Sequence, residues 1–437
     1  MKKRILVLVV LQLFMVLGSC SSESGNDSTT EPPVVVVKTA KVTSYSKNSG
    51  ETGETITMYG ENFSDKVSDV KLTFDGVVAT IVSATATEIK FILPQTDKLI
   101  PNLVLTIENR TINNEVKNDY QGNIGILPKK STSDWITIPY NANIEIGTIQ
   151  VENDKLMYYS TNKDVYKTMD GGITFTRWAT VFVPGGIFHA TKNDEGWSSM
   201  GSEIEKVPVG GLGIKIGELI KPTNGAIFTS LYVDSNMKDG TVISGKGAVF
   251  TTTNGLDFTK IHEVSGDGSY IFRASTIDNN HIWAVGYKSK NSQEQNNGKY
   301  KPFILFRNDP TDYWKEYTFV EEPEGYSARE ISFTDTQNGF ILIGRNQSGT
   351  FLDVKLFKTT NGGNSWTQVY HGEKFTKFAF KDANIGWAIL ENKIYKTTNG
   401  GTTWTVDYTN DQPINGISYK NNIVWAISSN KILKRYL

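Results

Sequence analysis

The residues best suited to chemistry are charged side chains that share a column when the internal repeats of the chain are aligned. Glu145, Arg273, Glu330 and Lys377 fall in this column, together with Gly416. A facing pair of carboxylates such as Glu145 and Glu330 can hydrolyse a glycosidic bond, one as the acid and the other as the base or nucleophile. The favoured interpretation is that water, Lys377 or Arg273 satisfies these charges, so no residue is assigned a catalytic role.

Other kinds of site find little support. His189, His262, His281 and His371 fall in different repeats and lack the spacing of metal ligands, so no metal site is expected. Phosphate-loop, nucleophile-elbow and dinucleotide-binding signatures do not occur, and no cofactor is expected. The 45 basic and 46 acidic residues nearly balance, which argues against a nucleic-acid partner.

One short motif recurs through the C-terminal two-thirds of the chain. Its sequence at residues 395–404 is Tyr-Lys-Thr-Thr-Asn-Gly-Gly-Thr-Thr-Trp, and near-copies stand at residues 357–366, 166–175 and 250–258. Asn-Gly between alternating Thr, aromatic and Lys residues predicts a tight β-hairpin, because both residues tolerate positive φ. The Asn or Asp side chain can bond to amides two residues on, and the closing aromatic ring can pack. Recurrence indicates an array of one supersecondary unit.

The motif resembles an Asp-box (BNR) repeat, and its Asn-Gly-Gly-Thr-Thr-Trp form most resembles propellers of the photosystem II assembly-factor type. In Asp-box families these turns lie away from the active centre, so their role here is interpreted as structural. Sialidases share the repeat but need a cluster of arginines around the substrate carboxylate. The column offers Arg273 alone, since Arg329 and Arg345 do not align with it, which argues against a sialidase. Xyloglucanase-type propellers, which use two carboxylates, stay an alternative.

A second recurring element, a strand that begins with Gly or a β-branched residue and then an aromatic, precedes each hairpin. It occurs at Trp197, Trp283, Phe340, Trp387 and Trp425. With an inner strand and the two hairpin strands, it predicts blades of four strands. The inner strands are expected near Ile144, Ile187, Ile227, Ile271, Ile331, Phe378 and Ile417.

These inner strands predict a seven-bladed propeller over residues 131–437. Six blades are the alternative, because the hairpins near Ile204 and Phe306 are degenerate. The last blade has three strands of its own, and residues 134–140 are expected to supply the fourth. Pairing the two ends of the propeller would remove exposed sheet edges.

The candidate binding face is the one opposite the repeated hairpin turns. It is expected to carry loops 266–268, 321–326, 370–373 and 408–411 and the long polar insert 288–301. Loops on a rigid ring commonly hold binding residues. The candidate binding residues are Tyr326 and His371 from these loops and the cations Arg273, Arg329 and Lys377. The mixture of groups suits a glycan or a polar protein surface.

Residues 37–128 show a different pattern of short alternating strands. Strands are expected at residues 41–45, 55–59, 70–74, 87–92 and 103–107, which suits an immunoglobulin-like sandwich without its cysteine pair. The pattern Gly53-x-Thr55 to Gly60-x-Asn-Phe63, with Phe74-Asp-Gly76, resembles an IPT/TIG domain. Gly60 is interpreted as a turn glycine and Phe63 as a core side chain. The resemblance implies a spacer or contact module without chemistry.

The N-terminus resembles a bacterial lipoprotein signal peptide. Three basic residues precede an apolar run over residues 5–17, and Leu17-Gly-Ser-Cys20 resembles a lipobox. Cys20 would become the lipidated residue, and residues 21–36 would form a flexible tether. The alternative is an ordinary secretory signal. Cys20 is the single cysteine, so no internal disulfide is expected.

The sequence thus predicts an all-β, lipid-anchored protein of the bacterial cell envelope, at the outer membrane. An immunoglobulin-like sandwich is followed by a propeller that acts as a non-catalytic module for a glycan or protein ligand. A glycoside hydrolase and an assembly factor for other envelope proteins are the alternatives. The oligomeric state stays open.

Overall fold

The computed structural model describes residues 39–140, 147–180, 187–199, 203–211, 214–215, 227–311, 313–347 and 350–437. Their elements lie in a unit that spans Ala40–Leu437, and nearly all of them are strands. Cys20 and Glu145 lie outside the described residues, as does the inner strand expected near Ile144. Among the described helices, none has the length and apolar character needed to cross a bilayer.

The N-terminal part of this unit is an immunoglobulin-like sandwich, as the alternating pattern predicts. One sheet has the strand order β10-β1-β3-β7-β6 and another the order β5-β4-β8-β9, with a small parallel pair β11-β2 beside them. Their inward residues, including Ile56, Leu72 and Phe91, form one apolar core. The elements are β1 Lys41–Tyr45, β2 Ser49–Glu51, β3 Thr55–Glu61, η1 Val67–Asp69, β4 Val70–Phe74, β5 Val77–Val78, β6 Thr80–Ala84, β7 Glu88–Ile92, β8 Leu103–Ile107, β9 Arg110–Thr111, β10 Asn113–Asn114 and β11 Gly125–Leu127.

Gly60 has a different role from the one expected. It lies inside strand β3 rather than in a turn. A Cβ atom at Gly60 would come within 2.2 Å of the Phe63 ring. The glycine is needed because the Phe63 ring, which is buried as expected, packs directly on the strand backbone.

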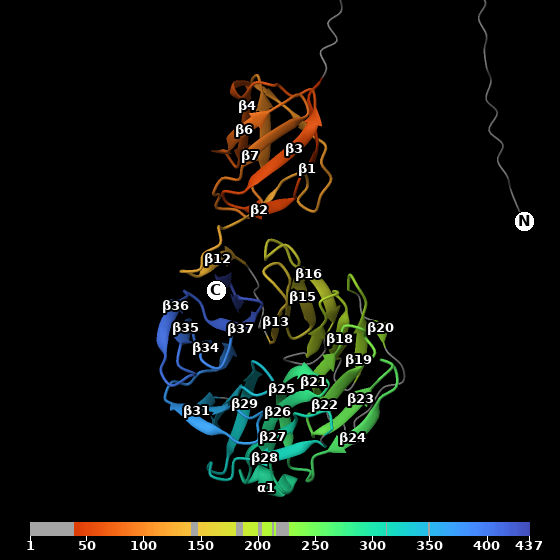
Figure 1. The fold of residues 1–437 in the computed structure, drawn as a ribbon, viewed down its shortest axis with the longest axis vertical. Coiled ribbons are helices and arrows are strands. Elements are labelled where there is room, and N and C mark those ends of the chain that lie inside the picture. Colours follow the sequence, from red (N-terminus) through yellow and green to blue (C-terminus); the bar gives the residue numbers. More distant parts are fainter. Residues whose placement is uncertain are drawn as a thin grey trace, which may run out of the picture. The chain divides into compact units, whose positions relative to one another are not determined.

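Seven four-stranded antiparallel sheets form the propeller, and Figure 1 shows them arranged as a ring. We number the blades in chain order from the first complete one. Blade 1 comprises β13 Ile149–Val151, β14 Met157–Ser160, β15 Asp164–Thr168 and β16 Thr176–Thr180, and blade 2 comprises β17 Phe188–Ala190, β18 Gly196–Ser199, β19 Ile204–Val207 and β20 Ile214–Lys215. Blade 3 comprises β21 Phe228–Val233, β22 Gly240–Ser244, β23 Ala248–Thr252 and β24 Thr259–Glu263, and blade 4 comprises β25 Tyr270–Asp278, β26 His281–Lys288, β27 Lys301–Arg307 and β28 Lys315–Thr318.

The remaining three blades close the ring. Blade 5 comprises β29 Tyr326–Phe333, β30 Gly339–Gln347, β31 Thr350–Thr359 and β32 Thr367–His371, blade 6 comprises β33 Lys377–Phe380, β34 Gly386–Leu390, β35 Lys393–Thr397 and β36 Thr405–Thr409, and blade 7 comprises β37 Ile414–Lys420, β38 Ile423–Ser428, β39 Lys431–Tyr436 and β12 Ile136–Pro139. Strand β12 pairs with β39 in antiparallel register, Ile136 opposite Lys434. Closure by the two ends of the propeller is confirmed, and the six-bladed alternative is wrong.

Large aromatic side chains fill the spaces between neighbouring blades. Trp197, Trp283, Phe340, Trp387 and Trp425, the aromatics of the second recurring element, are all fully buried. The Trp283 ring of blade 4 stacks on Phe333 of blade 5 with centroids 3.6 Å apart. Phe340 of blade 5 stacks in the same way on Phe380 of blade 6, at 3.5 Å. Five of the seven blades therefore carry a buried aromatic that the sequence repeats, and in blades 4 and 5 it stacks directly on a ring of the next blade.

The recurring motif forms the turns after the third strand of blades 1, 3, 5 and 6. We call residues 169–175, 253–258, 360–366 and 398–404 the repeat turns. They are longer than the tight hairpin turns expected, because β31 ends at Thr359 and β32 begins at Thr367. Positive φ falls on the glycines, such as Gly400 (70°) and Gly401 (88°), and not on the preceding Asn.

The Asn side chain also reaches further than expected. Asn399 Oδ1 accepts the amide of Thr403, four residues on, at 3.0 Å. The Trp404 indole donates to the Gly401 carbonyl at 2.9 Å, and Trp366 donates in the same way to Gly363 at 3.0 Å.

Candidate functional site

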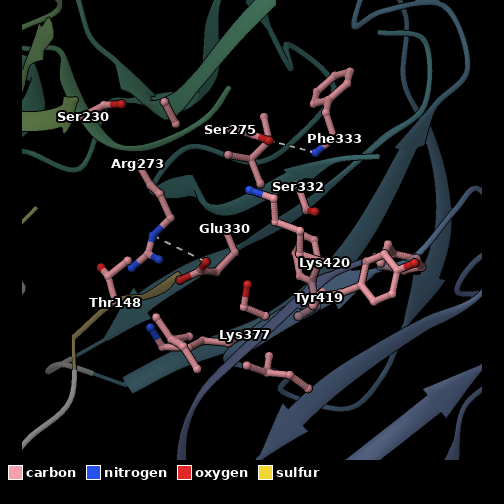
Figure 2. A pocket seen from close by; sticks show the side chains of 18 of the residues that line it. Thr148, Ser230, Arg273, Ser275, Glu330, Ser332, Phe333, Lys377, Tyr419 and Lys420 are labelled. Carbon is pink, nitrogen blue, oxygen red and sulfur yellow. Dashed lines mark hydrogen bonds and ion pairs between the residues drawn. The ribbon is translucent and has the colours of Figure 1, made fainter. Parts of the chain in front are cut away.

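The seven inner strands surround a central cavity of about 500 Å³. Residues from β13, β17, β21, β25, β29, β33 and β37 line it, and hydroxyl and charged groups predominate. Figure 2 shows Arg273, Glu330 and Lys377 grouped in this cavity, with Thr148 beside Arg273. The structure thus brings together three members of the predicted column. Gly416 adjoins the lining residue Ile417, and Glu145 is outside the described residues.

The three charged residues form a small electrostatic group. Arg273 Nε lies 3.5 Å from Glu330 Oε2, and Lys377 Nζ donates to the Gly147 carbonyl at 2.9 Å. Burial lowers the pKa of Lys377 to about 8, and the positive charge of Arg273 acts in the same direction while Glu330 opposes it. Two cations and one carboxylate leave a net positive charge, which suits an anionic ligand more than a cationic one.

Arg329 reaches the same region from outside the column because its strand is bulged. The β29–β30 register shifts between Ala328 and Glu330, and the β25–β26 register shifts likewise between Ile271 and Arg273. The extra residues are Arg329 and Phe272, at matching positions in neighbouring blades. A bulge redirects the side chain of the extra residue. Here the two side chains meet, with Arg329 Cζ 3.9 Å from the centre of the Phe272 ring.

Around this contact lies a group of side chains that we call the platform. It consists of four aromatic residues, Tyr270, Phe272, Tyr287 and Tyr300, together with Arg329. The rings follow one another, with centroids 5.2 Å apart for Tyr270 and Phe272, 5.6 Å for Phe272 and Tyr287, and 4.6 Å for Tyr287 and Tyr300. All five side chains are partly exposed. They stand at the ends of β25, β26 and β27 and near the start of β29, on the face opposite the repeat turns.

Tyr326 and His371 come together in blade 5, on the same face. The Tyr326 hydroxyl donates to one carboxylate oxygen of Asp353, and His371 Nε2 contacts the other. The Tyr326 hydroxyl and the His371 imidazole hold the pKa of Asp353 below its usual range. Neither residue lines the central cavity. The five candidate binding residues therefore divide between the cavity, the platform and this polar cluster.

Sequence reasoning missed most of the platform. Phe272 stands at a position where other inner strands carry the polar residues Thr229, Arg329 and Asn415, and an aromatic ring there was a usable signal. Tyr287 directly precedes the insert 288–301, which was interpreted as a polar loop, and Tyr300 lies near the end of that insert. Their meeting across the insert depends on how that loop folds, and it contains a short helix, α1 Ser292–Asn296.

The residues that line the cavity give little support to the glycoside hydrolase alternative. Among the described residues that line it, Glu330 is the single carboxylate, and it is paired with Arg273. Two carboxylates flanking the scissile bond are needed for ordinary glycoside hydrolysis. In the part of the chain that the structure describes, no group of His, Cys, Asp and Glu side chains could hold a metal ion.

Comparison with known proteins agrees with this architecture. Residues 40–122 match the family model of the IPT/TIG domain. A search of the curated proteins finds no match. Among solved structures, YCF48 bound to D1 peptide is 16% identical, covers 71% of this chain and 99% of its own, and superposes with a TM-score of 0.52.

YCF48 from Cyanidioschyzon merolae is also 16% identical, covering 69% of this chain and 98% of its own with a TM-score of 0.50. An auxiliary nutrient binding protein from Bacteroides thetaiotaomicron is 11% identical and covers 92% of this chain and 98% of its own, with a TM-score of 0.31. The likeness to the two YCF48 structures, at 16% identity, shows the fold alone, which is a β-propeller.

Proposed function

We propose that this protein is a lipid-anchored module of the bacterial cell envelope whose propeller binds a glycan or protein partner without catalysing a reaction. The binding face is the one opposite the repeat turns. The observation that carries the proposal is the platform, where partly exposed aromatic rings and an arginine border a polar cavity. Aromatic rings and Arg are the residues that binding surfaces favour.

The surroundings of the platform support binding over structural packing. The aromatics between blades are fully buried, whereas those of the platform keep part of their surface in water. Arg329 donates through Nε to Ser327 Oγ at 3.0 Å, which fixes its guanidinium above Phe272. A pre-positioned side chain loses little entropy when a ligand arrives.

The proposed location in the cell envelope is inferred from the sequence of residues 1–36. The lipobox-like Leu17-Gly-Ser-Cys20 supports lipidation at Cys20, and the polar stretch that follows supports a tether to the outer membrane. Metabolic labelling with an alkyne fatty acid should mark the wild-type protein and not Cys20→Ser. Labelling that persists in Cys20→Ser would contradict the lipid anchor.

The proposed binding is tested with the form that begins after Pro33. A screen of glycan arrays and polysaccharide pull-downs, with product analysis of every hit, should find binding without cleavage that survives Glu330→Gln. Cleavage abolished by Glu330→Gln or Glu145→Gln would establish the hydrolase alternative instead. If the screen captures a protein partner instead of a glycan, loss of that partner in Tyr287→Ala/Tyr300→Ala would support the same binding face. Under the assembly-factor alternative, this partner would be another protein of the cell envelope.

A further inference from the structure

The platform lies between two polar hollows and joins them. Phe272, a member of the platform, also lines the central cavity. Tyr300, another member, lines a groove of about 670 Å³ beneath the insert 288–301. The rings of Phe272, Tyr287 and Tyr300 follow one another between these two residues. Cavity, platform and groove therefore make one path across blade 4, which we call the rim path.

Positive charge gathers at both ends of the rim path. Near the platform the cavity is lined by two cations, Arg273 and Lys377, against one carboxylate, Glu330, which leaves an excess of positive charge. Two further lysines of the cavity, Lys381 and Lys420, stand at or just after the C-terminal ends of β33 and β37, on the face of the repeat turns, and Lys420 is paired there with Glu152. The net charge of the chain is only −1 at pH 7, so this concentration is local.

The groove repeats this arrangement at the other end. Four lysines line it, Lys288, Lys290, Lys299 and Lys301, against Glu294 and Glu324. Lys288 is paired with Glu316 and Lys301 with backbone carbonyls. Lys290 and Lys299 are exposed, and neither has an ion pair with any described residue. Clefts lined by one sign of charge concentrate ligands of the opposite sign.

Hydroxyl groups supply the remaining polar contacts. Ser265, Ser289 and Thr318 line the groove, and Thr148 and Ser230 line the cavity. The buried Thr229 hydroxyl, also in the cavity lining, has no hydrogen-bond partner among the described residues. An unpaired buried hydroxyl calls for a partner that the protein itself does not provide.

We propose that the rim path binds an extended anionic polysaccharide, whose sugar rings lie on the platform and whose carboxylate or sulfate groups meet the cations at either end. This rests on the proposed function of the face opposite the repeat turns. A protein partner would call for buried apolar pockets for anchoring side chains. The rim path offers instead partly exposed rings, hydroxyls and separated cations, which match a chain of sugars with periodic acidic groups.

The test uses polygalacturonate as the carboxylated probe, with its methyl-esterified form as the neutral control. Dextran sulfate, with dextran as its control, distinguishes sulfate from carboxylate as the anionic group. Calorimetric titration at low and high salt should show binding of at least one charged polymer, binding at least roughly tenfold weaker for its neutral control, and loss of affinity with salt. Equal affinity for charged and neutral forms would overturn the proposal.

Matched surface variants locate the charge effect. Lys290→Ala/Lys299→Ala should weaken binding roughly threefold to tenfold, because both side chains are exposed and their contributions are modest. Lys192→Ala/Lys238→Ala removes the same charge from exposed positions in the turns after β17 and β21, on the face of the repeat turns, and should leave affinity unchanged. Equal weakening by both pairs would show non-specific attraction and would overturn the proposal.

Failure of this inference and failure of the proposed function give different results. If Tyr287→Ala/Tyr300→Ala abolishes binding of a neutral glycan or a protein while the lysine pair has no effect, the face binds but not an anionic polymer. If charged polymers bind and neither the tyrosine pair nor the lysine pair weakens them, both the rim path and the proposed binding face are wrong.

Discussion

The two faces of the propeller use their polar and aromatic residues in opposite ways. On the face of the repeat turns, Asn399 and Trp404 bond within their own loop and Gly401 keeps a positive φ of 88°. On the other face, bulged strands lift Phe272 and Arg329 out of register, and the platform stays partly exposed. The contrast teaches that residues repeated from blade to blade build the ring. The platform aromatics do not recur from blade to blade, and in the proposed function they contact the ligand.

The largest effect is expected at the repeated aromatics between blades. Trp283→Ala removes a ring stacked on Phe333 and an indole that donates to the Gly362 carbonyl of a repeat turn at 2.8 Å. The free energy of unfolding should fall by about 3–5 kcal/mol, as for other buried large-to-small changes. Urea denaturation measures it. A loss no larger than that of Tyr287→Ala would contradict the division between the faces.

A smaller effect on stability is expected from Lys377 at high pH. The folded protein loses this proton at about pH 8, whereas the unfolded chain keeps it to about pH 10.5. Because the unfolded state binds more protons in this window, the free energy of unfolding should rise between pH 8 and pH 10.5, by on the order of 3 kcal/mol. Lys377→Met should lose this rise. Identical pH profiles for the two proteins would show that burial does not lower this pKa.

On the binding face, the tyrosine pair should affect ligand affinity more than stability. Tyr287→Ala/Tyr300→Ala should weaken binding at least roughly tenfold, since each ring contributes stacking to the ligand. Its free energy of unfolding should change by less than about 1 kcal/mol, because both rings are partly exposed. Titration and denaturation of the same sample test both parts. If the substitutions lowered the free energy of unfolding and left ligand affinity unchanged, the role of Tyr287 and Tyr300 would be structural.

A substitution in a repeat turn should lower stability and leave ligand affinity unchanged. Asn399→Ala loses the bond to the Thr403 amide and should lower the free energy of unfolding by about 1 kcal/mol without changing affinity. Asn399→Asp keeps the acceptor, as Asp170 does in blade 1, and should be close to wild type. Reduced ligand affinity in Asn399→Ala would place part of the site on this face.

Much of the fold was predictable because its blades are built from sequence motifs that recur along the chain. The Gly-aromatic strands, the hairpin motif and the short final blade were enough to predict seven blades and the pairing of β12 with β39. The geometry of the repeat turns was not, because the second glycine and the Asn bond to Thr403 extend the loop. Local propensity alone favours the shorter turn.

The candidate site was predictable only in part. Alignment of inner strands placed Arg273, Glu330 and Lys377 in one cavity, since these strands share a register around the ring. It could not place Arg329, because one bulge shifts its side chain away from the column. Tyr287 and Tyr300 meet across a folded insert, a contact that no local pattern encodes.

The most direct test of the central claim is hydrogen–deuterium exchange of the propeller with and without the bound ligand. The account predicts slower exchange in residues 268–273, 286–301 and 326–330, with no change in the repeat turns 360–366 and 398–404. Protection confined to the repeat turns would show that the ligand occupies the face assigned here to structure, and would contradict the account.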